Sequence, residues 1–241
     1  MSTLSSSPHG PSSVVVGMTG ASGALYAVRL VEVLLASGCQ VQLSISTAGA
    51  AVLEQEMGLN VDVQRFRPES LLPAEGVWRK FAHLAGGRED RANVPAAADV
   101  HAGWGRLHYF HHSDLMAPMA SGSARSAGMV ICPCSGGTLS AVAHAASANL
   151  IQRAAEVHLK ERRKLILVPR EAPLSLVHID NMRRVTEAGA VVLPASPGFY
   201  HGVRNVADLV DFVVARICDQ LAVEHHLMPR WGEAPKEAAG A

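Results

Sequence analysis

Five side chains in the second half of the sequence have the chemistry to bind a phosphate group. Arg153 and Lys160 lie seven residues apart on one expected helix, and about 100° per residue puts them on the same face. Arg170 follows an expected strand, Tyr200 lies in a loop, and Arg216 lies on the last expected helix. Such groups can hold a phosphate by several charge-assisted hydrogen bonds. The alternative is that Arg153 and Lys160 belong to a solvated helix face, in keeping with the charged run at 160–163.

Glu187 is a further candidate for chemistry because its expected position is electrostatically unfavourable. It lies in the last turn of an expected helix, just before Gly189, where a carboxylate opposes the helix dipole. A local cost of this kind hints at function, although an ordinary surface glutamate also explains it. No Ser-His-Asp order stands out, so the sequence does not support hydrolysis.

Four histidines raise the question of a metal site: His101, His108, His111 and His112. Their spacing matches no zinc pattern, and no cysteine accompanies them. We therefore expect histidines without a metal, and we assign no metal ligand.

A glycine-rich stretch at residues 14–24 is typical of a nucleotide phosphate site. β-Branched residues favour a buried strand, Gly17, Gly20 and Gly23 break it into a turn, and apolar residues then recur at helical spacing. Glycines let the backbone approach a ligand, and free amides at a helix start attract an anion. The spacing matches neither the Rossmann Gly-x-Gly-x-x-Gly nor a P-loop, so a tight turn without a ligand is the alternative.

The elements that position these residues alternate between strand and helix. We expect strands at 14–16, 41–46, 128–132, 165–168 and 190–193. Helices are expected at 24–37, 47–57, after Ser135 as N-cap, at 151–163, from Pro173 to about 188, and at 206–222. This alternation predicts a single α/β domain with a Rossmann-like, doubly wound, mostly parallel sheet. Ligands of such sheets bind at the carboxyl ends of the strands, where the small-residue turns, Ser46, Arg170 and Tyr200 are expected. Residues 58–120 fit this rhythm poorly.

Composition excludes several classes of function. The 241 residues are 49% hydrophobic and carry 21 basic and 21 acidic side chains, which argues against a general nucleic-acid or membrane-surface binder. Four cysteines in apolar contexts favour a reduced, cytoplasmic protein. Residues 1–13 lack the features of a signal peptide, and no apolar run is long enough for a membrane helix. We expect a disordered tail at 1–13, a domain at 14–231 and a loose tail at 232–241.

Several separate motifs, in order along the chain, closely resemble the UbiX/Pad family of flavin prenyltransferases. They are the run from Gly17 to Tyr26, Ser121-Gly-Ser123, Pro133-Cys-Ser135, the run from Arg153 to Arg163, Val168-Pro-Arg-Glu-Ala-Pro-Leu174, Gly198-Phe-Tyr-His201, Asp219-Gln220 and Arg230-Trp231. The resemblance covers about residues 14–57 and 120–231. It implies a metal-independent enzyme that joins the dimethylallyl unit of dimethylallyl phosphate to N5 and C6 of reduced FMN. It further implies prenylated FMN as a product for a UbiD-type decarboxylase, and homododecamers with active sites at subunit junctions.

The resemblance also implies roles for individual residues. Gly20, Ala21 and Ser22 would hold the phosphate side of FMN, and Ser46 would contact the flavin. The cofactor site would be completed by Ser135, Gly136, Gly137, Thr138 and Arg170. The dimethylallyl phosphate would be held by Arg153, Lys160, Tyr200 and Arg216, with Arg170 reaching it from a neighbouring subunit. The residues implied in catalysis are Ser22, for proton handling, Lys160, and the carboxylates Glu56 and Glu187.

Two features depart from the family pattern. The stretch between Glu56 and Ser121 is longer than expected, so residues 58–120 are interpreted as an atypical insertion with its own histidines. Gly136 and Gly137 replace bulkier residues after the Cys-Ser pair, which either loosens flavin contacts or lets the backbone come closer. Two alternatives stay open: a flavin-dependent cysteine decarboxylase of the related fold, whose signature is missing at 194–200, and a non-catalytic FMN carrier.

Overall fold

The structure of the protein is a computed structural model that describes residues 13–86 and 102–228. The tails expected at 1–13 and 232–241 lie outside the described residues, except for Ser13, and so do His101 and the Arg230-Trp231 pair. No prediction made for those positions is tested by the fold.

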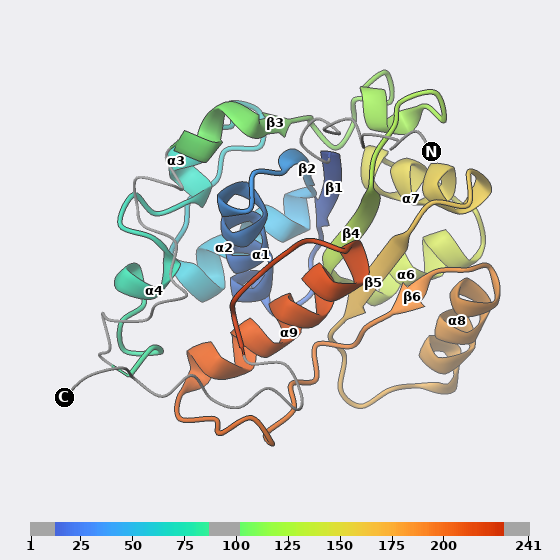
Figure 1. Cartoon of the computed structure of the whole chain (residues 1–241). Coiled ribbons are helices and arrows are strands. Elements are labelled where there is room, and N and C mark those ends of the chain that lie inside the picture. The colour runs from blue at the N-terminus through green and yellow to red at the C-terminus, as the bar shows by residue number, and fades with distance from the viewer. Residues whose placement is uncertain (1–12, 87–101, 229–241) are drawn as a thin grey trace, which may run out of the picture.

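Six parallel strands form a single sheet among the described residues, in the order β3-β2-β1-β4-β5-β6 (Figure 1). The strands are β1 (Ser13–Met18), β2 (Gln40–Ile45), β3 (Leu107–Tyr109), β4 (Gly128–Cys134), β5 (Leu165–Pro169) and β6 (Val191–Val192). This is the order of a doubly wound sheet, and the chain reverses its direction of travel between β1 and β4. The predicted fold class is confirmed.

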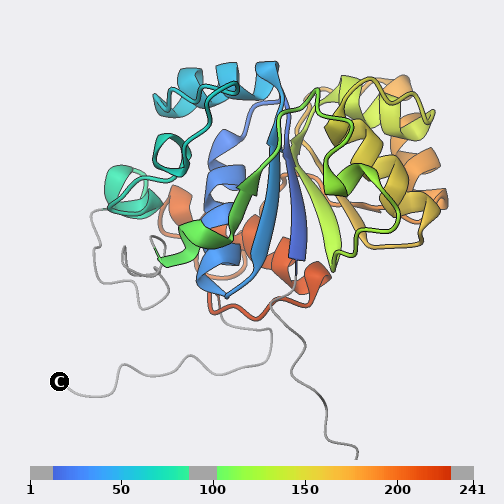
Figure 2. The same cartoon turned by 90° about the horizontal axis from the view of Figure 1, so that it is seen from above.

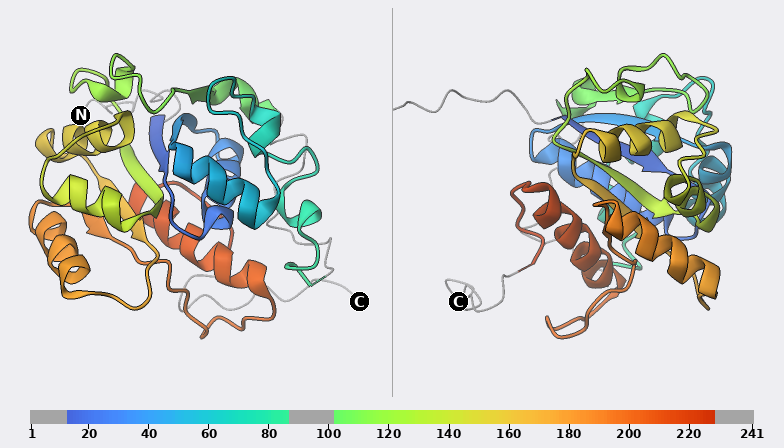
Figure 3. Two further views of the ribbon diagram at one scale, coloured as in Figure 1. Left: turned by 180° about the vertical axis from the view of Figure 1, so that it is seen from behind. Right: turned by 90° about the vertical axis from the view of Figure 1, so that its right-hand side faces the viewer.

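Helices cover both faces of the sheet, and each face has its own core. They are α1 (Ala24–Ala36), α2 (Thr47–Met57), α6 (Gly136–Ala143), α7 (Leu150–Lys160), α8 (Leu176–Glu187) and α9 (Val206–Leu221). One core joins α1, α2 and α9 to alternate strand residues such as Val14 and Val16, and the other joins α6, α7 and α8 to Val15 and Ile131. Figure 2 shows the strands between these two groups, and Figure 3 shows the same separation from behind and from the side.

The edge strand β3 was not predicted. It lies inside the stretch interpreted as an insertion and pairs with β2, with Leu107 opposite Val41 and Tyr109 opposite Leu43. Three residues are too few to show the alternation that reveals a strand. The chain reaches β3 from α2 through α3 (Pro68–Leu71), α4 (Val77–Lys80) and the 3-10 turn Trp104–Arg106, and a second 3-10 turn, Pro118–Ala120, follows it. Part of residues 58–120 is therefore the crossover that a parallel sheet requires.

Local signals place most helix ends well. Ser46 and Ser135 cap α2 and α6, their hydroxyls accepting from the amides of Gly49 and Thr138. Pro173 is an exception, because α8 begins at Leu176 rather than at Pro173. The N-cap is Ser175, which supplies the side-chain acceptor that proline lacks.

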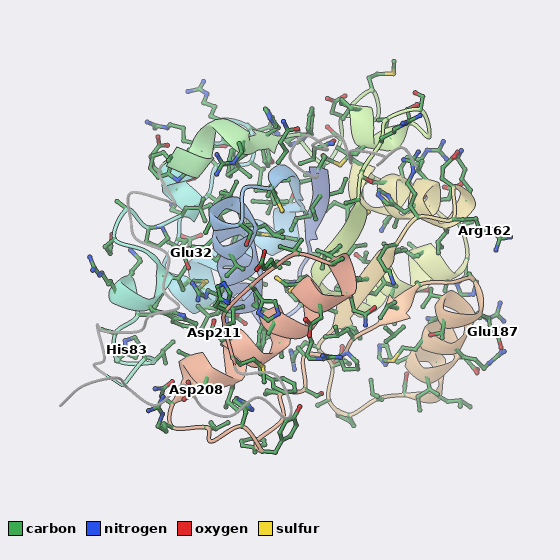
Figure 4. The ribbon with its side chains drawn as sticks, in the orientation of Figure 1. Glu32, His83, Arg162, Glu187, Asp208 and Asp211 are labelled. Carbon is green, nitrogen blue, oxygen red and sulfur yellow. The ribbon has the colours of Figure 1, made fainter. Side chains whose placement is uncertain are left out.

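A buried charge cluster connects α1 and α9, which cover the same face of the sheet. Arg29 on α1 is fully buried, and its Nη1 lies 2.5 Å from Glu32 Oε2 while its Nε lies 2.8 Å from Asp211 Oδ1 on α9. The other oxygen of Glu32 accepts from the amide of Val77 at 2.9 Å. Figure 4 labels both carboxylates. The cluster thereby joins α1, α9 and the crossover segment around α4.

Candidate functional site

The two small-residue turns meet at the carboxyl ends of β1 and β4, the point where the strand order reverses. The buried Thr19 hydroxyl joins them, donating to the carbonyl of Pro133 at 2.7 Å and accepting from the amide of Ser135 at 2.8 Å. Sequence reasoning did not single out Thr19, although its position in the first turn was available. Ligands of doubly wound sheets bind at this reversal point, so the candidate site is placed here.

Glu56, near the C-terminal end of α2, binds the small-residue turn that follows β1. Its carboxylate accepts from the amides of Gly23, at 3.0 and 3.2 Å, and of Ala24, at 2.9 Å. Gly23 has φ of +111°, a conformation that favours glycine. Glu56 therefore lies beside this turn. Its carboxylate accepts hydrogen bonds from the first amides of α1 and interacts favourably with the dipole of that helix.

Ser46 lies beside the first turn. Its amide donates to the carbonyl of Met18, the last residue of β1, at 3.0 Å. A Cβ atom on Gly20 would lie 2.5 Å from Cβ of Ala48, so glycine permits the close approach of this turn to α2. The structure thus brings Gly20, Ala21, Ser22, Ser46 and Glu56 together at one edge, as predicted.

The second turn presents open amides at the start of α6. Ser135 Oγ accepts from the amide of Thr138 and donates to its hydroxyl. The amides of Gly136 and Gly137 have no intrahelical acceptor, and no described residue outside the helix accepts from them. A Cβ atom on Gly137 would meet nothing within 4 Å. This helix start has the features of an anion-binding site.

Arg170 follows β5 directly and adds a cation to the same edge. Its Nε is buried and has no hydrogen-bond partner among the described residues. Pro169, the residue before Arg170, pairs with Cys134 at the end of β4, so Arg170 follows the strand beside the one that leads into α6. An orphaned donor at the same edge as two open helix amides fits an anionic group such as a nucleotide phosphate. Glu171, the next residue, is exposed at this edge. Sequence reasoning did not single out Glu171, although a residue directly after a parallel strand is expected at this edge.

The predicted phosphate-binding set does not converge within one chain. Arg153 and Lys160 lie on α7, on one face of the sheet, whereas Arg216 lies on α9, on the other. Lys160 also ends α7 near the amino end of the sheet, about 10 Å along the helix from Arg153. Each is paired with a nearby carboxylate: Arg153 with Glu156, Lys160 with Glu161 and Arg216 with Asp219.

Tyr200 lies in the loop after β6, at the carboxyl end of the sheet. Its ring meets those of His201 and Phe212 edge-on, and 65% of the residue is exposed. The tyrosine is therefore on the predicted edge, but facing outward.

Glu187 lies at the opposite end of the sheet from the two turns. It ends α8 close before β6, its carboxylate accepts from Arg183 at 2.6 Å, and its side chain is 61% exposed (Figure 4). The adjacent residues Ala188 and Gly189 line a surface hollow with Arg162. Within one chain, the structure does not bring Glu187 to the site, and the ion pair with Arg183 accounts for its unfavourable helix position.

The cysteines and histidines near the site have structural environments. Burial raises the pKa of the Cys134 thiol to about 12, and burial also raises that of Cys132, so neither is a thiolate nucleophile. The rings of His111 and His112 lie in tilted contact near α2, where His112 Nε2 lies 3.1 Å from the Thr47 hydroxyl. Within 13–86 and 102–228, no group of three or more potential ligands is arranged to hold a metal.

Comparisons with known proteins agree on one family. The Flavoprotein family model matches residues 2–218. The chain is 44% identical over 224 residues to flavin prenyltransferase UbiX of Pseudomonas aeruginosa, covering 93% of this chain and 96% of the relative. It is 36% identical to UbiX of Methanocaldococcus jannaschii over 219 residues, 91% and 98% of the two chains.

Solved structures give the same result. AnUbiX (PadA1), in complex with FMN and dimethylallyl pyrophosphate, superposes with a TM-score of 0.72 at 31% identity, covering 93% of this chain and all of that one. A dodecameric FMN-dependent UbiX-like decarboxylase from Escherichia coli O157:H7 gives 0.68 at 33% identity, covering 92% and 100%. Among the described helices, none combines the length and apolar character needed to span a membrane. From the family model and the identities to these relatives, the chain belongs to the UbiX flavin prenyltransferase family of flavoproteins.

Proposed function

We propose that this protein is a flavin prenyltransferase that transfers the dimethylallyl unit of dimethylallyl phosphate to N5 and C6 of reduced FMN. The observation that carries the proposal is the pair of turns joined by Thr19 at the strand reversal, with two open helix amides and the orphaned Nε of Arg170 at the same edge of the sheet. This geometry suits an anionic nucleotide, and the UbiX relatives are named flavin prenyltransferases. The product, prenylated FMN, would serve a UbiD-type decarboxylase.

The flavin would lie across both turns. Its phosphate would be held by the amides of Gly136 and Gly137 and by Arg170, while the first turn and Ser46 would contact the ring system. This set contains every predicted flavin residue: Gly20, Ala21, Ser22, Ser46, Ser135, Gly136, Gly137, Thr138 and Arg170. The prediction put Gly20, Ala21 and Ser22 at the phosphate side, whereas the proposal puts the phosphate at the start of α6, because the Glu56 carboxylate already binds the amides of Gly23 and Ala24.

The prenyl phosphate site would be completed by neighbouring copies. Because Arg153, Lys160 and Arg216 lie on different faces and ends of one chain, they can act together only across subunits. Exposed apolar side chains in the first turn of α8 support such contacts, since Leu176 and Val177 are 73% and 67% exposed and Ile179 is 50% exposed. The dodecameric UbiX-like relative, at 33% identity, supports a homododecamer.

The side chains then have distinct roles in the transfer. Bound reduced FMN supplies the nucleophilic N5 and the neighbouring C6. Arg153, Lys160, Tyr200 and Arg216 would stabilise the charge that gathers on the departing phosphate, a role that metal ions play in other transferases. Glu56 would hold the first turn, with Ser22 handling a proton.

For the general acid or base, we propose Glu171 rather than Glu187. Glu171 lies at the carboxyl ends of the strands, in the same chain that would bind the flavin, whereas Glu187 would have to come from another copy.

The first experiment is anaerobic incubation of the purified protein with reduced FMN and dimethylallyl phosphate. Mass spectrometry of the released flavin should show a gain of about 68 Da, the mass of one five-carbon unit added with ring closure. Lys160→Ala should keep FMN bound and lose turnover. Unmodified flavin from a folded, flavin-loaded wild-type protein would contradict the proposal.

A mixing experiment tests the shared site. Lys160→Ala and Glu56→Gln are each expected to be inactive alone. Co-expressed, they should regain part of the activity, because some sites then receive Lys160 from one copy and Glu56 from another. Mixed oligomers without activity would show that both groups act from the same chain.

A further inference from the structure

His178 lies at an unusual place in the candidate site. It is the third residue of α8, and it completes a capping box in which Ser175 Oγ accepts from the His178 amide and His178 Nδ1 accepts from the Ser175 amide, both at 3.3 Å. This position is commonly glutamate or glutamine. Histidine differs from glutamate and glutamine because Nδ1 can make the cap while the second ring nitrogen, Nε2, stays available for another hydrogen bond.

The hydrogen bonds of the cap determine the role of the second nitrogen. An amide can only donate, so Nδ1 is an acceptor and the ring proton is on Nε2. The Ser175 hydroxyl, 2.9 Å from Nδ1, can donate to the same nitrogen. No described residue accepts a hydrogen bond from Nε2. His178 therefore presents a fixed, unused N–H donor.

This donor lies over the start of α6. A Cβ atom on Gly136 would lie 2.8 Å from His178 Nε2 and 3.2 Å from its Cδ2, so the imidazole takes the space of a side chain at position 136. With the ring in this position, residue 136 has to be glycine. Gly136 and Gly137 leave the α6 amides open, and His178 Nε2 lies beside them.

We propose that His178 is a cofactor-binding residue whose Nε2–H donates to a phosphate oxygen of FMN at the start of α6. This inference rests on the proposed function, because it requires FMN to place its phosphate there. The phosphate would accept hydrogen bonds from the amides of Gly136 and Gly137, from Arg170 and from the imidazole. Gly136 is then required because a side chain there would displace the donor.

The test compares FMN with riboflavin, which lacks the phosphate. Binding of both to purified apoprotein is measured by flavin fluorescence for wild type, His178→Ala and His178→Gln. His178→Ala should weaken FMN binding by about tenfold or more, the range for a hydrogen bond to a charged group, with riboflavin affinity unchanged. His178→Gln, which can form the cap and offers an N–H, should recover part of the loss.

Gly136→Ala adds a second, independent test. It should weaken FMN binding in the wild-type background, because the new methyl displaces the ring, and cost much less when His178 is already alanine. FMN affinity within about twofold of wild type in His178→Ala, or an equal loss for riboflavin, would overturn the inference. Wild-type protein that binds no FMN would instead refute the proposed function, so the two failures are distinguishable.

Discussion

Replacing Arg29 with methionine is expected to destabilise the fold by about 3–5 kcal/mol, the cost of breaking a buried ion pair. Methionine has a similar length and no charge, so the change removes the guanidinium that both Glu32 and Asp211 contact. Arg29 is fully buried, and the side chains of its two partners are 1% and 4% exposed. Water therefore cannot replace the lost contacts.

The magnitude follows from the geometry. With charge centres about 4 Å apart and an effective dielectric constant of about 20, each of the two pairs contributes about 4 kcal/mol. Desolvation of the buried groups offsets several kcal/mol of that sum in the native protein. The variant loses both attractions while its carboxylates remain in the interior, which gives a net loss in the stated range.

Urea-induced unfolding, followed by circular dichroism, measures the effect. Glu187→Gln is the matched control, since it breaks the exposed pair with Arg183 and should change the free energy of unfolding by less than about 0.5 kcal/mol. The triple variant Arg29→Met/Glu32→Gln/Asp211→Leu removes all three charges and keeps an acceptor for the Val77 amide. It should be more stable than Arg29→Met alone. A loss below about 1 kcal/mol in Arg29→Met, or a triple variant that is no more stable, would refute the reasoning.

Three other predictions concern single groups. Thr19→Val should weaken FMN binding by about tenfold in a fluorescence titration because the two turns lose their link, whereas Thr19→Ser should bind nearly as wild type. Burial lowers the pKa of His158 below its ordinary value of 6.5, so the unfolded chain binds a proton that the folded chain does not. The free energy of unfolding should therefore fall as the pH drops below about 6.5, and the fall from about pH 7 to 5.5 should be smaller in His158→Gln. The buried thiols should react with a disulfide reagent only after unfolding, and rapid labelling of the native protein would contradict this for Cys39, Cys132, Cys134 and Cys218.

The parts of the fold that could be predicted are those with local signals. Thr47–Met57 was expected as a helix and is one, because its serine cap and the glycine that follows it mark both ends. The edge strand Leu107–Tyr109 carries no such signal. Its pairing with β2 is decided by the tertiary fold, which short-range patterns do not contain.

The site residues likewise divide into those that a local sequence signal reveals and those whose position depends on the tertiary fold. The turn residues were found because strand, glycine turn and helix follow one another in sequence. The spacing of Arg153 and Lys160 correctly places them on one helix, but it does not say which face of the sheet that helix covers. Glu187 was chosen for its helix position, whereas Glu171 follows a strand end, the feature that brings residues to the ligand edge of a parallel sheet.

The carboxylate of Glu56 has a consequence for how activity losses in this protein are interpreted. It is a structural cap on α1 and also lies beside the flavin turn, so its removal changes two things at once. A slow Glu56→Ala variant would not by itself identify a proton-transfer group, because the backbone beneath the flavin would have lost its anchor. Since α2 leads directly into the segment at 58–86, a shift of α2 caused by a substitution in that segment would reach the first turn through the same carboxylate. Substitutions at 58–86, which contact no residue proposed to hold FMN, would then alter flavin binding through Glu56.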